Sequence, residues 1–164
     1  MPETPRRFLR LLLTAVLLAT TPLVHLVAQS EPNPLLGTWR LDLAKSRYSP
    51  GPPPTAETRI YARDAAGVVG QIDRRYADGR RDVIDYRADY DRDYPVSGTK
   101  LYDLVRFRRI DEYTTEGVLS HAGQVYGSSR RVLSADGETM TITFRRTELG
   151  DMVNNVAVYH KERK

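Results

Sequence analysis

The sequence predicts an all-β domain, a small antiparallel up-and-down β-barrel of about 8–10 strands, preceded by an N-terminal signal helix. Three observations lead to this fold class. Short runs of alternating apolar and polar residues follow one another from residue 37 onward. Turn signals such as Asp78-Gly79 and Asp136-Gly137 separate these runs. No sustained helical stripe is present in this region, so the pattern favours strands.

The N-terminal segment has the features of an export signal. Three arginines within the first ten residues form a basic region, and an apolar run follows at residues 11–24. At 1.5 Å per residue that run covers about 21 Å, less than the roughly 30 Å hydrocarbon core of a bilayer. We therefore expect residues 1–28 to be a cleaved signal peptide, with an uncleaved membrane anchor as the alternative. The general secretory route would deliver the protein to the periplasm or beyond it as a secreted protein.

The composition excludes several classes of protein. Without cysteine the chain can form no disulfide scaffold, Cys-based zinc site, iron–sulfur cluster or thiol nucleophile. The formal net charge is +4, but the signal segment holds three of the basic residues and one of the acidic ones. Its removal leaves 22 basic and 20 acidic residues. That balance is too even for a nucleic-acid-binding protein, and membrane contact is expected only through an uncleaved signal segment.

After a linker at residues 29–36, the barrel domain is expected at residues 37–164. Trp39, Leu41 and Leu43 share one face of its first strand. The segment at residues 46–55 holds three consecutive prolines and is expected to be an extended surface crossover, because proline fits neither a helix interior nor a central strand. The further strands are expected near residues 57–63, 68–76, 81–88, 101–110, 113–121, 124–133, 139–144 and 155–161.

Sequential antiparallel pairing of so many short strands favours closure of the sheet. Closure removes the exposed edges, at which unpaired backbone groups would invite pairing with other chains. A two-sheet sandwich is the alternative, and strand alternation alone does not separate the two.

Several short motifs carry a resemblance to a known family. Gly37-Thr38-Trp39 matches the G-x-W that opens the first strand of lipocalins and related calycin barrels. Further matching pieces, in the same order, lie at residues 37–54, 93–98, 134–137 and 154–159. The chain thus resembles exported bacterial lipocalin-like proteins of the calycin superfamily over nearly the whole mature sequence. The resemblance implies a small antiparallel barrel and, as in better-known calycins, a lumen that holds one small apolar ligand.

A structural plug is expected at one end of the barrel. Gly37 and Trp39 would form it, because a large rigid aromatic side chain at the start of the first strand can close a barrel end. In lipocalins an arginine from a later strand stacks across this tryptophan. The resemblance implies that Arg145 or Arg146 takes that place here.

Two strands present rows of apolar residues that we expect to face the lumen, because alternate residues of a strand share a face. An arginine continues each row. Tyr159 of the last strand is expected in the barrel wall, where cytosolic fatty-acid-binding proteins carry Arg-x-Tyr. Ala157 replaces that arginine here. The candidate ligand-binding residues are Val105, Phe107, Arg109, Met140, Ile142, Phe144, Arg146 and Tyr159.

The many arginines in the expected strands allow two interpretations. Inward guanidiniums near a barrel rim could bind a carboxylate or phosphate through two parallel hydrogen bonds. Alternatively, they form a solvated surface and pair across strands with Asp73, Asp82, Asp85 and Asp103.

Metal sites find little support in the sequence. Asp89, Asp91 and Asp93 begin a calcium-loop pattern, but Tyr94 and Lys100 stand where the pattern needs Gly and Glu. We expect no metal and no cofactor.

Catalytic motifs are also lacking, so we expect no enzyme. Ser120 and His121 are neighbours on a strand and point apart, so they cannot form a nucleophile–base pair. The function expected is binding of a small hydrophobic or amphipathic molecule in the lumen. The alternative is a barrel packed solid with side chains, acting as a structural or protein-interaction module of the cell envelope.

Overall fold

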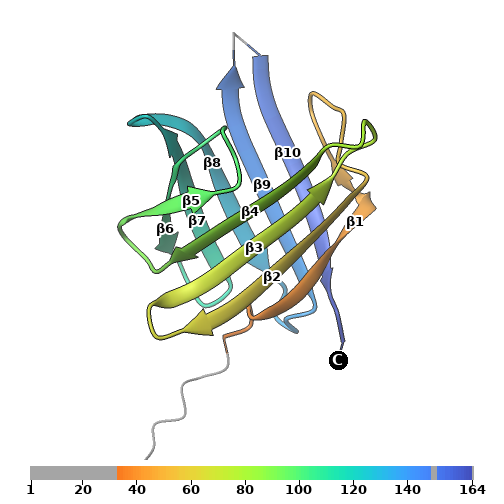
Figure 1. Ribbon diagram of the computed structural model, residues 1–164. Coiled ribbons are helices and arrows are strands. Elements are labelled where there is room, and N and C mark those ends of the chain that lie inside the picture. The colour runs from red at the N-terminus through yellow and green to blue at the C-terminus, as the bar shows by residue number, and fades with distance from the viewer. Residues whose placement is uncertain (1–32, 149–150, 164) are drawn as a thin grey trace, which may run out of the picture. The chain divides into compact units, whose positions relative to one another are not determined.

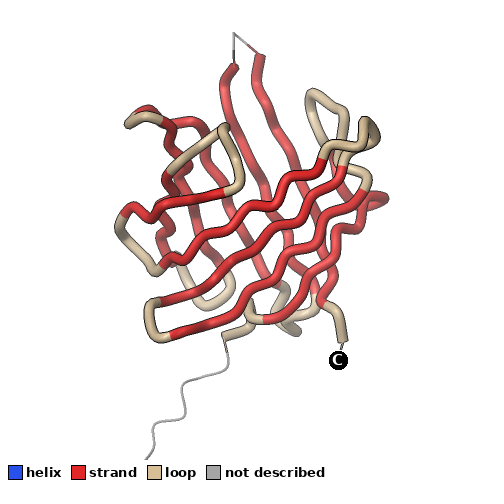
Figure 2. The backbone as a smooth tube through the Cα atoms, viewed as in Figure 1, coloured by secondary structure: helices blue, strands red, loops and turns tan. Residues whose placement is uncertain are grey.

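The computed structural model describes residues 33–148 and 151–163, and this part of the chain is built from strands and loops (Figure 2). The predicted signal peptide at residues 1–28 and the first residues of the predicted linker lie outside the described residues. Across the described ranges, no helix has the length and hydropathy needed to span a bilayer.

Ten antiparallel strands form one closed barrel, because each pairs with its neighbours in sequence and the first pairs with the last (Figure 1). This confirms the predicted fold class, an up-and-down barrel. The strands are β1 (Gly37–Arg47), β2 (Ala56–Asp64), β3 (Gly67–Arg75), β4 (Arg81–Ala88), β5 (Asp93–Ser97), β6 (Leu104–Arg109), β7 (Thr114–His121), β8 (Gln124–Leu133), β9 (Thr139–Glu148) and β10 (Asp151–Lys161).

β5 is the strand that the sequence pattern did not predict. It is 5 residues long and contains Pro95, whose ring leaves no N–H to donate to a neighbouring strand. It pairs with β4 only at Asp85 and Tyr86, and with β6 at three positions. Only the two flanking strands make this segment a strand, so local alternation could not reveal it.

The two ends of the barrel differ. The plug end holds Trp39 together with the turns that follow β2, β4, β6 and β8. The crossover end holds the proline-containing segment at residues 48–55 together with the turns that follow β3, β5, β7 and β9. In Figure 1, β2, β3 and β4 form the front wall and β7 to β10 lie behind them.

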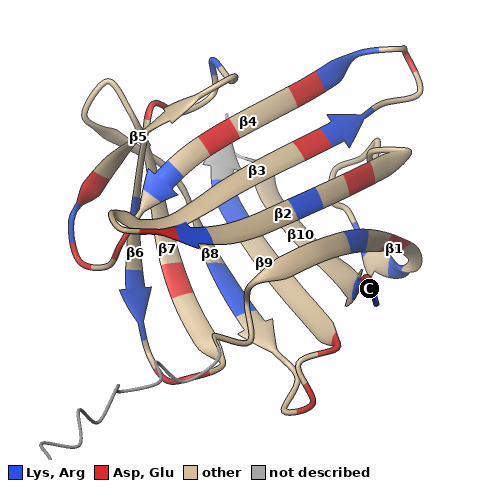
Figure 3. Ribbon diagram, turned by 60° about the horizontal axis from the view of Figure 1, so that its bottom comes forward, with Lys and Arg blue, Asp and Glu red and all other residues tan. Residues whose placement is uncertain are grey.

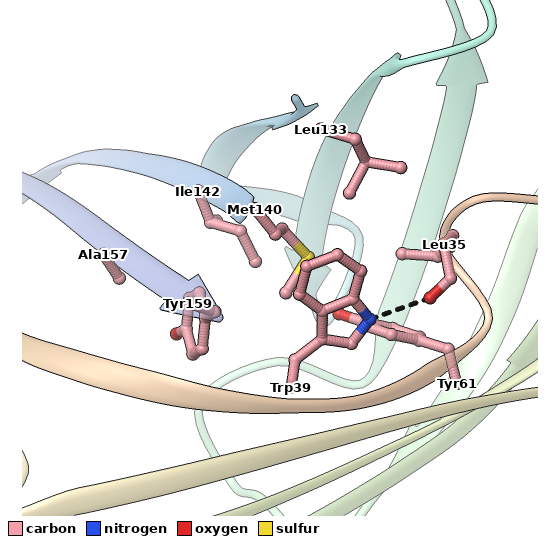
Figure 4. Packing of buried hydrophobic residues seen from close by; sticks show 8 residues of the cluster. All are labelled: Leu35, Trp39, Tyr61, Leu133, Met140, Ile142, Ala157 and Tyr159. Atoms are coloured by element: carbon pink, nitrogen blue, oxygen red, sulfur yellow. Dashed lines mark hydrogen bonds between the residues drawn. The ribbon is translucent and has the colours of Figure 1, made fainter. Parts of the chain in front are cut away.

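Trp39 is fully buried and closes the plug end, as predicted. Its indole Nε1 donates a hydrogen bond of 2.8 Å to the carbonyl oxygen of Leu35, so its single polar atom is satisfied (Figure 4). Leu35 itself is only 4% exposed, so the end of the predicted linker packs onto the barrel. The cluster around Trp39 draws side chains from four other strands, β2, β8, β9 and β10: Tyr61, Leu133, Met140, Ile142, Ala157 and Tyr159.

The cation beside Trp39 is Lys161, so the expected role of Arg145 in the plug is wrong. Lys161 Nζ lies 5.1 Å from the centre of the Trp39 ring and donates a hydrogen bond of 2.8 Å to the carbonyl oxygen of Pro34. The physical reason is register: Trp39 pairs with Lys161 across β1 and β10, whereas Arg145 is exposed and pairs with Asn154 farther along β10. Gly37, with φ of +133°, leaves room for the stem of Lys161, because a Cβ there would lie 2.9 Å from its Cε.

Candidate ligand-binding site

A cavity of about 260 Å³ lies inside the barrel, between the plug and the crossover. Its walls combine aromatic, apolar and cationic groups. Seven tyrosines and two phenylalanines line it, and Pro50, Pro52 and Pro54 of the crossover contribute at that end. Four arginines also line it, and the lining contains no acidic residue: Arg59, Arg74, Arg131 and Arg146.

Six of the eight predicted ligand-binding residues line this cavity: Val105, Phe107, Ile142, Phe144, Arg146 and Tyr159. They come from three strands, β6, β9 and β10. The seventh, Met140, points inward but lies in the plug cluster, where it is fully buried below the cavity floor. The alternate residues of β9 that begin with Met140 therefore point inward, as expected. Met140 itself belongs to the plug and not to the cavity wall.

The expectation that Arg109 faces the lumen is wrong. Arg109 is the last residue of β6, at the plug end, and its side chain is exposed. Its Nε donates to the carbonyl oxygen of Asp111 in the following turn, at 3.2 Å. The row that begins with Val105 and Phe107 leaves the barrel interior at this point, so alternation no longer implies burial.

A buried carboxylate organises one wall of the cavity. Glu57 has a side chain 1% exposed. Its two oxygens accept hydrogen bonds from Arg59 Nε at 2.6 Å and from Arg74 Nε at 2.5 Å. The hydroxyl of Tyr159 donates to the same carboxylate at 2.7 Å. Three strands, β2, β3 and β10, are thus joined by one acidic side chain.

The two guanidiniums decide the ionisation of Glu57. Burial alone would raise the pKa of this carboxyl, because desolvation disfavours the charged form. The positive charges of Arg59 and Arg74, with their hydrogen bonds, more than offset that effect and lower the pKa from 4.5 to about 2. Burial also raises the pKa of Tyr159, which therefore keeps the proton that it donates.

This lowered pKa predicts a loss of stability in acid. The folded state binds the Glu57 proton less readily than the unfolded chain, so the stabilisation is complete above about pH 4.5 and is lost as the pH falls toward about 2. Urea unfolding at a series of pH values should show the stability of the wild type falling more steeply over this range than that of Glu57→Gln. The difference between the two curves isolates Glu57 from the other carboxylates, and parallel curves would contradict the prediction.

Sequence reasoning did not place Glu57, Arg59, Arg74 or Arg131 among the ligand-binding residues. On β2 the inward row is Glu57, Arg59 and Tyr61, while Ile60 between them is 42% exposed, so hydropathy predicts the opposite face. A signal did exist on β3 and β8. Arg74 lies two positions after the buried Ile72, and Arg131 lies two positions before the buried Leu133. Because residues two apart on a strand share a face, alternation places both arginines inside the barrel.

Glycines make room for the aromatic wall of the cavity. At Gly70 an added Cβ would lie 2.4 Å from the ring of Tyr86, which is its direct neighbour across β3 and β4. At Gly127 a Cβ would lie 2.7 Å from the ring of Phe144. These rings lie flat over neighbouring strands because no side chain stands beneath them, and this keeps the lumen from being filled.

Basic and acidic residues both occur along β2, β3 and β4 (Figure 3). The predicted pairing of surface arginines is confirmed for Asp73, which accepts two hydrogen bonds from Arg81 at 2.8 and 2.9 Å. It is wrong for Asp82 and Asp85, which accept hydrogen bonds from neutral side chains.

Asp103, the fourth acid expected to pair with an arginine, lies beside a histidine instead. Its Oδ2 is 3.8 Å from His121 Nδ1 and accepts a hydrogen bond from the backbone N–H of Ala122. In the calcium-like pattern, Asp93 is held by two hydrogen bonds from Arg106 at 2.7 and 2.9 Å. No three His, Asp or Glu side chains in the described ranges converge to hold a metal ion.

Comparison with protein-family models, curated proteins and solved structures finds no significant match to this chain.

Proposed function

We propose that this protein is an exported, lipocalin-like carrier that binds a small amphipathic molecule in the barrel lumen without transforming it. The observation that carries the proposal is the cavity of about 260 Å³, which is close to the lower limit of about 300 Å³ for typical ligand sites. A barrel packed solid would have no such space, so the cavity favours the carrier over a structural module.

The lining suits a molecule with an apolar body and a polar end. Aromatic and aliphatic side chains make up most of the surface, and burial of apolar ligand surface would drive binding. Arginines supply hydrogen-bond donors that fix the orientation of a polar group.

Tyr48, at the crossover end, offers a further polar contact. Its hydroxyl is buried at the cavity and has no hydrogen-bond partner among the described residues. Burial raises the pKa of Tyr48 to about 12, so this hydroxyl is protonated at neutral pH. A buried hydroxyl without a partner costs about 1–3 kcal/mol, which a polar atom of a ligand would recover.

The export part of the proposal rests on the N-terminal sequence. The basic region and the apolar run at residues 11–24 support delivery to the periplasm or to the medium. The G-x-W motif at residues 37–39 and the closed barrel support a lipocalin-like relationship.

Native mass spectrometry tests the carrier proposal. The full coding sequence is expressed with its own N-terminal segment, and the protein is purified from a periplasmic extract without detergent. We expect the mass of a chain that lacks residues 1–28, together with an adduct of a few hundred daltons. Phe144→Ala should weaken retention of the adduct, because it removes a ring from the cavity wall.

Arg145→Ala is the matched control, since this neighbour of Phe144 on β9 is exposed. It should retain the adduct in full. A protein that carries no adduct in extracts from several growth conditions would argue against the carrier and for a protein-interaction module.

A further inference from the structure

We propose that Arg131 is the anion anchor of the lumen and that the ligand is a small aromatic carboxylate, seated with its charged end on this guanidinium at the plug end of the cavity. The inference rests on the proposed function, because it names the class of molecule that the same cavity would hold.

The charges of the cavity arginines are compensated unequally. Arg59 and Arg74 share one carboxylate, that of Glu57, which lies behind the wall. Arg131 forms no ion pair with any acidic side chain in the described part of the chain. Its positive charge is partly buried, and burying a charge is unfavourable unless an opposite charge accompanies it. A ligand carboxylate would supply that charge.

The surroundings of Arg131 hold it in place for this role. Its guanidinium lies 5.3 Å from the ring centre of Tyr61 and 5.6 Å from that of Phe107. The hydroxyl of Tyr61 lies 3.5 Å from Arg59 Nη1. These contacts orient the guanidinium but use few of its five N–H donors, so a pair remains for the two oxygens of a carboxylate.

An acidic residue of the protein does not take this place. Asp89 lines a second, smaller hollow together with Arg131. Asp89 is exposed, and no ion pair joins it to Arg131 among the described residues. The planar guanidinium of Arg131 can direct two parallel N–H donors at the two oxygens of a carboxylate.

The aromatic lining of the cavity favours a ligand with an aromatic body over one with an alkyl chain. The rings of Tyr86 and Phe107 have centres 5.5 Å apart, and those of Tyr126 and Phe144 have centres 6.2 Å apart. A flat ring inserted among them gains ring–ring contacts that an alkyl chain does not make. A volume of about 260 Å³ also suits a compact ligand better than a long chain.

Isothermal titration calorimetry with three probes tests the inference: naphthoate, its neutral amide naphthamide, and decanoate. The wild type should bind naphthoate about 10-fold or more tightly than naphthamide, because a charge-assisted hydrogen bond is lost with the amide. Arg131→Gln should remove this preference, because it weakens binding of the charged naphthoate more than binding of the neutral naphthamide. Arg130→Gln is the matched control, because its side chain faces outward and pairs with Glu116 at 2.8 Å.

Arg131→Lys is a second variant that tests the anchor if the glutamine variant does not fold. It keeps the charge but loses the planar pair of donors, so we expect a reduced preference for naphthoate. A preference that survives in both Arg131 variants would overturn the anchor while leaving the carrier proposal intact. Tighter binding of decanoate than of naphthoate would overturn the aromatic class. Failure of all three probes to bind the wild type would overturn the inference, and the adduct experiment separately decides whether the carrier proposal falls with it.

Discussion

Replacing Glu57 with glutamine is expected to lower the free energy of unfolding by about 3–5 kcal/mol, the range found when one partner of a buried ion pair is removed. Glutamine has nearly the same shape, so the change removes the charge rather than the packing. Arg59 and Arg74 would then keep their charges with side chains only 12% and 24% exposed and without a carboxylate between them. Urea denaturation followed by circular dichroism at neutral pH measures the effect.

Asp73→Asn provides the control for this prediction. It removes a carboxylate that also accepts two hydrogen bonds from an arginine, but Arg81 is 56% exposed and water replaces the lost partner. The loss of stability should be far smaller. If the Glu57 and Asp73 variants were equally stable, the buried carboxylate could not be what joins β2, β3 and β10.

Replacing Trp39 with alanine is expected to destabilise the barrel by about 3–5 kcal/mol, the range for removing a large aromatic side chain from a core. The indole is fully buried among side chains of four other strands, and its loss would leave a cavity at the plug end. It would also leave the carbonyl oxygen of Leu35 without its donor. Thermal unfolding monitored by circular dichroism, with urea titration for the free energy, measures the loss.

Trp39→Phe separates the contributions of packing and hydrogen bonding. Phenylalanine keeps most of the apolar surface but has no N–H for Leu35, so we expect a smaller loss than with alanine. The variant Leu43→Ala serves as the control, because Leu43 on the same strand is 41% exposed. A Trp39→Ala variant no less stable than Leu43→Ala would show that the plug does not hold the barrel end together.

Local pattern was sufficient for most of the strands. Alternation with a period of two placed nine of the ten strands, because the side-chain direction along a strand depends only on that strand. The same rule placed Ile142, Phe144 and Arg146 inside. It failed at Arg109, where β6 ends at the barrel rim and an inward direction no longer means burial.

The sequence by itself therefore determined the all-β class, the position of the plug tryptophan and the inward rows of β6 and β9. Only the tertiary structure decided which residues meet across strands: Lys161 on Trp39, and Glu57 with partners 17 and 102 residues away in the chain. The reason is physical. A buried charge is stable only if its partners are present, and register between distant strands brings those partners together, so no local hydropathy pattern can reveal it.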